Sequence, residues 1–365
     1  SRGLGDVYKR QELGRKGMRR VQLNQLTENM TLAKSIYHDG NLILAKGMDK
    51  LKDYVDKLEK FGIFSVYVKD DVSVDIEVLD AIHYETREKC KRILNSCFNT
   101  IKNQGNLSNN IIDEMVISIL SDLFEKEDVI VSMADIGVKD DATLIHSVNT
   151  AVFSVLTGRR MNLSEIELKN LAEGALLHDI GKVLISSNIL LKDGKLSDDE
   201  FANIKEHSLL GYEILLERTN MSEEARKIAL QHHERLDGSG YPYGLYGDQI
   251  SKLARIVAVS DVYDALTAER CYRKSMSNFK AYSIIKQDVG IKYDEEVFKK
   301  FMLNIAVYPN GVVVHLSDGT HGIVSRQNKG MPFRPVVRVI DDKDKEDIKL
   351  YDLNLLDDYG IYILD

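Results

Sequence analysis

Histidine is concentrated in one stretch of this chain. Five of its nine histidines fall between residues 146 and 233, where apolar residues recur with almost wholly helical spacing. They are His146, His178, His207, His232 and His233, and the carboxylates of Asp179 and Asp261 lie in the same helical region. A single histidine is usually structural, but so many on neighbouring helices, with acidic residues among them, favour a metal site. The sequence therefore predicts a helical domain that gathers these side chains around metal ions.

The remaining histidines, His38, His83, His315 and His321, lie outside this group, and we expect ordinary structural or surface roles for them. The chain has no iron–sulfur or structural zinc signature, because its 3 cysteines form no close pair. Together with the absence of a secretory signal and of a long apolar run, this composition predicts a cytoplasmic protein without a membrane span.

The bulk composition narrows the function further. The chain has 365 residues, 44% of them hydrophobic and 29% charged, which is enough for two or three soluble domains. Its net charge of -8 argues against DNA as a partner. An acidic protein can still bind a small anion in a cleft where cations and metal ions gather.

We expect a mainly α fold: an all-helical bundle between a small α/β N-terminal module and a small β C-terminal domain. The predicted boundaries are 1–17 for a non-native leader before Met18, 18–76 for the module, 77–108 for a linker helix, 109–302 for the helical domain and 303–365 for the β domain. The leader is expected because it lacks apolar periodicity.

Local patterns support this division. Short β-like runs at 21–23, 42–44 and 64–68 flank a helical pattern at 48–60 in the module, and further β runs fall at 311–316, 322–324 and 335–340. Within the helical domain, two capping boxes begin with Ser164 and Ser197, and Ser222 is expected to cap a helix that runs through His232 and His233. Another helix is expected over 252–272. The charged helix at 77–104 is expected to be a solvated connector, with pairing in a homodimer as the alternative.

The residue types explain the chemistry. Mixed imidazole and carboxylate ligands suit manganese, iron, nickel or zinc. A carboxylate has two oxygens and can bridge two metals, so Asp179 is the natural bridge. Two metals about 3.5–4 Å apart can hold a shared hydroxide and clamp a phosphate during in-line attack.

Several ordered segments carry a family resemblance. They are 140–149 with His146, His178-Asp179-Ile-Gly-Lys182, 189–197 followed by His207, His232-His233-Glu234 with Gly240-Tyr241-Pro242, and 254–267 with Asp261. In order and spacing they resemble the HD-GYP family, whose members hydrolyse cyclic dinucleotides, above all cyclic di-GMP.

The resemblance implies roles. His146, His178, Asp179 and Asp261 match ligands of a first metal, His207 and His232 match ligands of a second, and His233 matches a position that also faces the site. Two divalent transition metal ions are implied, with iron or manganese preferred and nickel, zinc or cobalt as alternatives.

Substrate contacts are implied too. Lys182 matches the family's phosphate-contacting lysine, and Arg270 and Arg273 match positions that grip substrate phosphates. The family usually has proline and tyrosine between these arginines, whereas this chain has Cys271 and Tyr272. Gly240 is expected to shape a turn beside the metals. Tyr241 is either a substrate contact or a packing ring.

One position departs from the family. Some members have a glutamate four residues before the first metal histidine, where it helps to hold a third metal. This chain has Ala142 there, so we expect two metals.

The expected function is hydrolysis of cyclic di-GMP, or a related cyclic dinucleotide, to a linear dinucleotide and then to GMP if a second cut follows. Two alternatives stay open. One is a general HD-type phosphohydrolase of mononucleotides, and the other is a catalytically weak sensor or scaffold that recruits a GGDEF-domain protein. The expected catalytic residues are Asp179 and Lys182.

Overall fold

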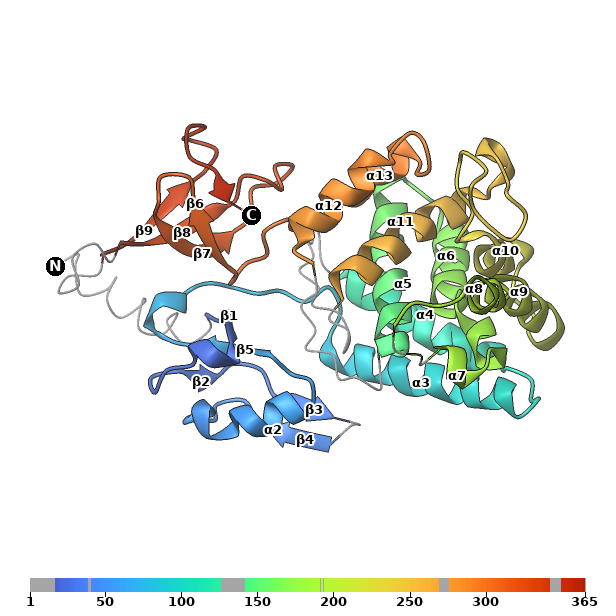
Figure 1. Ribbon diagram of the computed structural model, residues 1–365, viewed down its shortest axis with the longest axis horizontal. Helices are drawn as coiled ribbons and strands as arrows, with labels where there is room; N and C mark the ends of the chain where they lie inside the picture. The colour runs from blue at the N-terminus through green and yellow to red at the C-terminus, as the bar shows by residue number, and fades with distance from the viewer. Residues whose placement is uncertain are drawn as a thin grey trace.

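The computed structural model describes residues 17–38, 41–125, 142–190, 192, 194–268, 276–341 and 349–364. Within these ranges a small α/β module, a large helical region and an antiparallel β domain follow one another along the chain (Figure 1). The predicted fold class is confirmed. None of the described helices is long and apolar enough to cross a lipid bilayer.

The N-terminal module is built on a three-stranded antiparallel sheet. Its order is β1 (Arg19–Gln22), β5 (Ser65–Lys69) and β2 (Thr31–Leu32), with β5 in the centre. A hairpin of β3 (Ile36–His38) and β4 (Asn41–Leu44) stands beside it. The predicted helix is shorter than expected, because it begins with the 3₁₀ turn Leu51–Tyr54 and becomes α2 only at Val55–Lys60.

The helical region contains the elements that build the site. They are α3 (Tyr84–Lys102), α4 (Asn109–Phe124), α5 (Ala142–Arg160), α6 (Glu165–Leu177), the 3₁₀ turn η5 (Ile180–Leu184), α7 (Ser187–Leu190), α8 (Asp198–Lys205), α9 (His207–Arg218), α10 (Glu223–Gln231), the 3₁₀ turn η6 (Gly247–Gln249), α11 (Lys252–Thr267), α12 (Asn278–Gln287) and α13 (Glu295–Met302).

Helix α5 is the centre of this region. Every residue from 146 to 158 is buried, because α3, α4, α6, α11 and α13 all pack against it. An α-helix that is covered on all sides places its polar residues in the protein interior, where each needs a partner. His146 and Asn149 are two such residues.

The helix starts agree with the sequence more closely than the helix ends. Ser164 and Ser197 form the predicted capping boxes, and the Ser222 side chain accepts the Ala225 N–H at the start of α10. Helix α10 ends at Gln231 with His232 as its C-cap, so the expectation that it runs through His233 is wrong. Helix α11 ends at Thr267 rather than at 272, because Ala268 already has extended backbone angles.

Helix α3 differs from the expected solvated connector. Residues 87, 90, 94, 97 and 101 form a buried stripe at alternating spacings of three and four, and its apolar members Cys90, Leu94, Cys97 and Ile101 belong to the core of the helical region. Figure 1 shows α3 lying along one side of that region, against α4 and α5. The many charged residues on the opposite face made the sequence of this helix look solvent-exposed, so its apolar stripe was not recognised.

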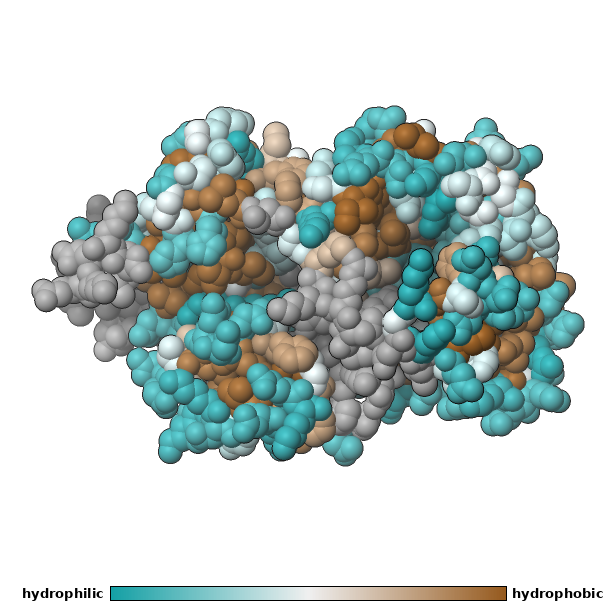
Figure 2. All heavy atoms as spheres, in the orientation of Figure 1, coloured by the Kyte–Doolittle hydropathy of each residue, from teal (hydrophilic) through white to brown (hydrophobic). Residues whose placement is uncertain are grey.

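The C-terminal domain is a five-stranded antiparallel sheet. Its order is β10 (Ile363–Leu364), β6 (Val313–Leu316), β7 (His321–Arg326), β8 (Val336–Asp341) and β9 (Lys349–Asn354). The three strands predicted here are confirmed, whereas β9 and β10 were not predicted because one is rich in polar residues and the other has two residues. Figure 2 shows apolar surface over this domain on the face that is drawn.

The two terminal modules touch one another. The Arg20 N–H donates to the Gly311 carbonyl at 3.0 Å, and Asn310 Nδ2 donates to the Glu77 carbonyl at 2.9 Å. Arg338 also donates to the Val74 carbonyl. The free edge of β1 therefore faces the chain just before β6.

The turn after α6 brings the backbone of η5 against α9. Helix α6 ends at Leu177, His178 keeps helical angles as its C-cap, and the chain then tightens into η5. A Cβ at Gly181 would lie 2.0 Å from the His207 carbonyl oxygen and 2.6 Å from the Gly211 nitrogen. Glycine at 181 is what allows the His178-Asp179 segment to approach His207.

We expect Gly181→Ala to reduce stability and to displace His207. Added atoms in a packed interior cost about 1–3 kcal/mol, and here the obstacle is backbone rather than a flexible side chain. The measurement is the free energy of urea unfolding. Gly211→Ala is the matched control, because its Cβ would approach the Gly181 nitrogen only to 3.3 Å and alanine is the better helix former. Equal effects of the two substitutions would contradict this explanation.

Candidate metal centre

All seven side chains that were expected to bind metal meet in the interior of the helical region. They come from α5 (His146), the residues directly after α6 (His178 and Asp179), the start of α9 (His207), the residues directly after α10 (His232 and His233) and α11 (Asp261). Apart from the half-buried His233, each is at most 8% exposed.

Asp179 stands between two groups of histidines. Its Oδ2 lies 3.4 Å from His178 Nε2 and 4.0 Å from His146 Nε2. Its Oδ1 lies 3.4 Å from His207 Nε2 and 3.9 Å from His232 Nε2. The ligand atoms of His146, His178 and Asp179 all lie within 4.8 Å of one another, and so do those of Asp179, His207, His232 and His233. One carboxylate is thus shared by two groups, with one oxygen facing each.

Asp261 belongs to the first group and also reaches His233. Its Oδ1 lies 3.0 Å from His146 Nε2 and 3.9 Å from His178 Nε2. Its Oδ2 lies 3.8 Å from His233 Nδ1. A second carboxylate, on α11, therefore faces the cluster.

The imidazole rings are held in one orientation by the backbone. His178 Nδ1 lies 2.7 Å from the Ala175 carbonyl oxygen, His207 Nδ1 lies 2.6 Å from that of Ile204, and His232 Nδ1 lies 2.9 Å from that of Ala229. A carbonyl can only accept, so Nδ1 carries the proton and the lone pair of Nε2 points to the cluster.

Two buried atoms at the centre lack a hydrogen bond among the described residues. They are His178 Nε2 and Asp179 Oδ1. Buried polar atoms are almost always paired, and a metal ion satisfies a lone pair of either kind. The residues present therefore fit a divalent metal ion.

The protonation states suit the same purpose. Burial lowers the pKa of His207 and His232, and burial above all lowers that of His233 to about 3, so these rings stay neutral at pH 7. Burial opposes ionisation of Asp179, but Lys182 and the surrounding histidines outweigh it and hold the pKa of this carboxyl well below its usual range. The centre thus offers neutral imidazoles and an ionised carboxylate.

His146 is the exception. Burial acts to lower its pKa, but hydrogen bonds to Asp261 and Asp264 outweigh burial and raise the pKa to about 10. A proton and a metal ion compete for the same Nε2, so binding of a metal there releases the proton. Metal affinity at this ligand therefore increases as the pH rises toward the raised pKa.

Lys182 and Tyr241 lie at the edge of the cluster. Lys182 Nζ lies 2.6 Å from Asp179 Oδ2, and the Lys182 side chain is 29% exposed. The Tyr241 ring packs on the His233 ring at a centroid distance of 4.7 Å. Lys205, which sequence reasoning did not single out, has its Nζ 5.9 Å from the centroid of the same tyrosine ring. The Tyr241 ring thus packs against a cluster histidine and lies near the Lys205 ammonium.

Gly240 closes the turn that carries Tyr241. A Cβ at Gly240 would lie 2.4 Å from Arg235 N and 2.5 Å from the His233 carbonyl oxygen, so the turn folds directly onto the backbone beside the paired histidines.

Arg270 and Arg273, which were expected to bind substrate phosphates, lie outside the described residues.

Comparisons with known proteins agree with this geometry. A family model for the HD domain matches residues 133–297, and one for a KOW domain associated with HD domains matches residues 313–365. A cyclic di-GMP phosphodiesterase of Pseudomonas aeruginosa is 34% identical over 232 residues, which are 64% of this chain and 55% of that protein. These matches place an HD domain at residues 133–297, and over this domain the chain resembles the HD-GYP family.

Other relatives of this chain have related names. A cyclic di-GMP phosphodiesterase of Thermotoga maritima is 31% identical over 65% of this chain and 64% of its own length. A 3'3'-cGAMP-specific phosphodiesterase of Vibrio cholerae is 38% identical over 51% of this chain and 40% of its own length. A solved HDG"Y"P protein from Bdellovibrio bacteriovorus aligns with a TM-score of 0.47 and 15% identity, covering 78% of this chain and 98% of that one. This chain spans only about half the length of the first of these relatives.

Two further residues support the site of this HD domain, and sequence reasoning assigned neither a role. Asp264 Oδ2 lies 2.7 Å from His146 Nδ1. Glu234 accepts the Tyr243 N–H at 2.8 Å through Oε1 and the Leu245 N–H at 3.0 Å through Oε2. Their positions in the sequence could have indicated a role at the site, because Asp264 follows Asp261 by one helical turn and Glu234 directly follows the paired histidines.

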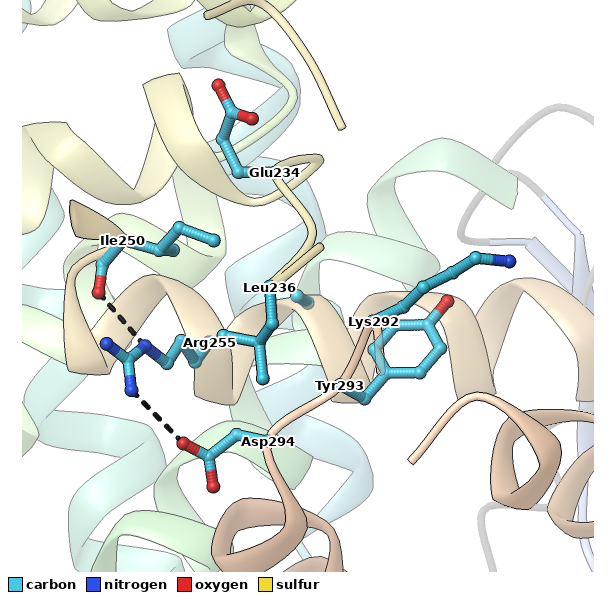
Figure 3. A pocket seen from close by; sticks show the side chains of 8 residues that line it. Glu234, Leu236, Ile250, Arg255, Lys292, Tyr293 and Asp294 are labelled. Carbon is cyan, nitrogen blue, oxygen red and sulfur yellow. Dashed lines mark hydrogen bonds and ion pairs between the residues drawn. The ribbon is translucent and has the colours of Figure 1, made fainter. Parts of the chain in front are cut away.

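A small pocket lies on the other side of Glu234 and is distinct from the metal cluster. Figure 3 shows Arg255 within it, donating to the Ile250 carbonyl at 3.0 Å and to Asp294 at 3.3 Å. None of the cluster histidines lines it. The pocket is therefore part of the packing behind the loop.

We expect Glu234→Gln to loosen the loop from 241 to 246. A glutamine keeps one acceptor, but its NH₂ group would face a backbone N–H that then has no partner, at a cost of about 1–3 kcal/mol. Urea unfolding measures the loss, and hydrogen exchange at Tyr243 and Leu245 locates it. Glu217→Gln, at an exposed position on α9, is the control. Unchanged hydrogen exchange at both amides would contradict a role for Glu234 in holding this loop.

Proposed function

We propose that this protein is a metal-dependent phosphodiesterase that hydrolyses cyclic di-GMP or a related cyclic dinucleotide. The observation that carries the proposal is the single carboxylate of Asp179, whose two oxygens face two separate groups of buried histidines. A carboxylate in this position suits a pair of divalent cations, and two-metal sites act on phosphate esters.

The ligand roles are part of the proposal. His146, His178, Asp179 and Asp261 would hold one ion. Asp179, His207 and His232 would hold the other, with His233 beside them. The donor set of imidazole and carboxylate suits iron or manganese, with nickel, zinc and cobalt as alternatives. When bound, two such ions would polarise a phosphoryl oxygen and lower the pKa of water.

The chain's own residues would bind and orient the substrate. Lys182 is the partly exposed cation closest to Asp179, so its ammonium can reach a phosphate at the centre and stabilise the charge that develops there. Hydrolysis forms a bond from a water oxygen to phosphorus and breaks the bond to the 3′-oxygen, which takes up a proton. The product is a linear dinucleotide, and a second cut would give GMP.

Arg270 and Arg273 would complete the phosphate contacts through their guanidinium groups. They follow α11 in the sequence, and α11 carries Asp261 at the cluster. Tyr241 and Gly240 would border the substrate on the side of His233. The names of the relatives, which act on cyclic di-GMP and on 3'3'-cGAMP, support the substrate class.

The first alternative, a general mononucleotide phosphohydrolase, is less well supported. The pair His207 and His232 and the ordered 241–246 loop are features beyond a single-metal HD site. The second, a sensor or scaffold without catalysis, is disfavoured because every expected metal ligand is retained in the cluster. Binding to a GGDEF-domain protein, a homodimer and a cytoplasmic location stay predictions.

The test is to measure metal content and turnover together. Protein reconstituted anaerobically with iron or manganese should contain close to two ions per chain and should hydrolyse cyclic di-GMP or 3'3'-cGAMP faster than nucleoside monophosphates. Asp179→Ala should abolish turnover and lower the binding of both ions, because it removes the ligand that both share. His315→Ala, on the β domain, is the control. If Asp179→Ala keeps both ions, the bridge is excluded.

The structure sharpens the expectation at Ala142. This residue begins the described part of α5 and lies one turn before His146, on the same face of the helix and exposed. A glutamate there would point toward the solvent side of the first group. Ala142→Glu should therefore permit a third ion, visible as an additional anomalous peak in crystals. A third peak in the wild type would show that another ligand supplies the missing oxygen.

A further inference from the structure

We propose that Arg87, on helix α3, is a positioning residue of the metal centre, acting through Asn149 and Asp264 on His146. This inference rests on the proposed metal site. It extends that site to a helix outside residues 133–297, the part of the chain that matches the HD-domain model.

His146 is oriented differently from His178, His207 and His232. His178, His207 and His232 give their Nδ1 protons to backbone carbonyls three residues earlier in the chain, which cannot turn away. His146 Nδ1 instead faces the side chain of Asp264 at 2.7 Å. A side chain can rotate, so the orientation of this one ligand depends on what holds Asp264.

Asn149 holds the other oxygen of Asp264. Its Nδ2 donates to Asp264 Oδ1 at 2.9 Å. An amide has a donor end and an acceptor end of nearly equal shape, so an unconstrained Asn149 could turn its oxygen toward the carboxylate. That arrangement would set two acceptors against each other and push Asp264 away from His146.

Arg87 selects the correct end of the amide. Its Nη1 donates to Asn149 Oδ1 at 2.6 Å. A guanidinium can only donate, so the amide oxygen must face Arg87 and the amide nitrogen must face Asp264. Arg87, Asn149 and Asp264 are each at most 5% exposed, so water does not substitute for any of these bonds. The chain of contacts thus runs without a break from α3 to the ring nitrogen opposite the metal-facing Nε2.

The first test compares metal affinity in three variants. Arg87→Met keeps the length and removes the donors, and should weaken one of the two ions by about 10–100-fold while the other is unchanged, as measured by competition with a chelator. Arg87→Lys, which again can only donate, should restore much of the affinity. Leu94→Ala loosens the same helix at a fully buried site away from Asn149, and should leave both affinities as in the wild type.

The second test does not depend on metal. A crystal structure of metal-free Arg87→Met should show Asn149 and Asp264 in changed orientations and the His146 ring turned. If Arg87→Met does not fold, Asn149→Leu interrupts the same path and must give the same result. Should the wild type bind no metal, the proposed function fails, and the crystal structure still decides the role of Arg87.

Two outcomes would overturn the inference. One is an Arg87→Met protein in which His146, Asp264 and both metal affinities match the wild type. The other is an equal, selective loss of one ion in Leu94→Ala, which would show that any loosening of α3 has this effect.

Discussion

The buried charge of Asp179 is the constraint on which the helical region depends. A carboxylate removed from water costs several kcal/mol unless opposite charges or hydrogen bonds compensate it. In this protein the Lys182 ammonium lies against Oδ2, whereas Oδ1 has no hydrogen bond among the described residues and faces the Nε2 atoms of His207 and His232. The fold brings these side chains to Asp179 by ending α6 and α10, and beginning α9, at the same point. Close packing of η5 on α9 follows from that convergence, which explains why a glycine stands at 181.

Two kinds of group hold the site in place: backbone carbonyls and side-chain carboxylates. Backbone carbonyls orient three of the histidines, so these rings are held as rigidly as the main chain around them. The Asp264 side chain orients His146, and the Glu234 side chain holds the loop after the paired histidines. Substitutions at these two carboxylates would therefore act on the site without touching a metal ion.

The clustering of the site's side chains could be predicted because they fall in short, ordered motifs. The mixture of histidines and aspartates at 146, 178–179, 207, 232–233 and 261 is visible without a structure, and so is the bridging capacity of a carboxylate. Helix starts were also predictable, since Ser164 and Ser197 act locally through their own capping boxes. Helix ends were less so, because no strong stop signal follows Gln231 or Thr267 directly.

What the sequence could not show depends on contacts between distant segments. Arg87 and Asn149 are separated by 62 residues, and nothing in the charged pattern of 77–104 marks one arginine as buried. The interpretation of α3 as a solvated connector was wrong for this reason. Likewise, the approach of Gly181 to the His207 carbonyl is a matter of packing between η5 and α9, which spacing along the chain does not reveal.

The contact between the two terminal modules has a consequence for dissecting this protein. Strand β1 is at the edge of its sheet, and its outer side meets the chain at Gly311 through the Arg20 N–H. An uncovered strand edge is a template for pairing with other chains. A fragment that stops after α13 would expose this edge, so self-association through the N-terminal sheet is the expected behaviour of such a truncation. The β domain thus shields the opposite end of the polypeptide from aggregation.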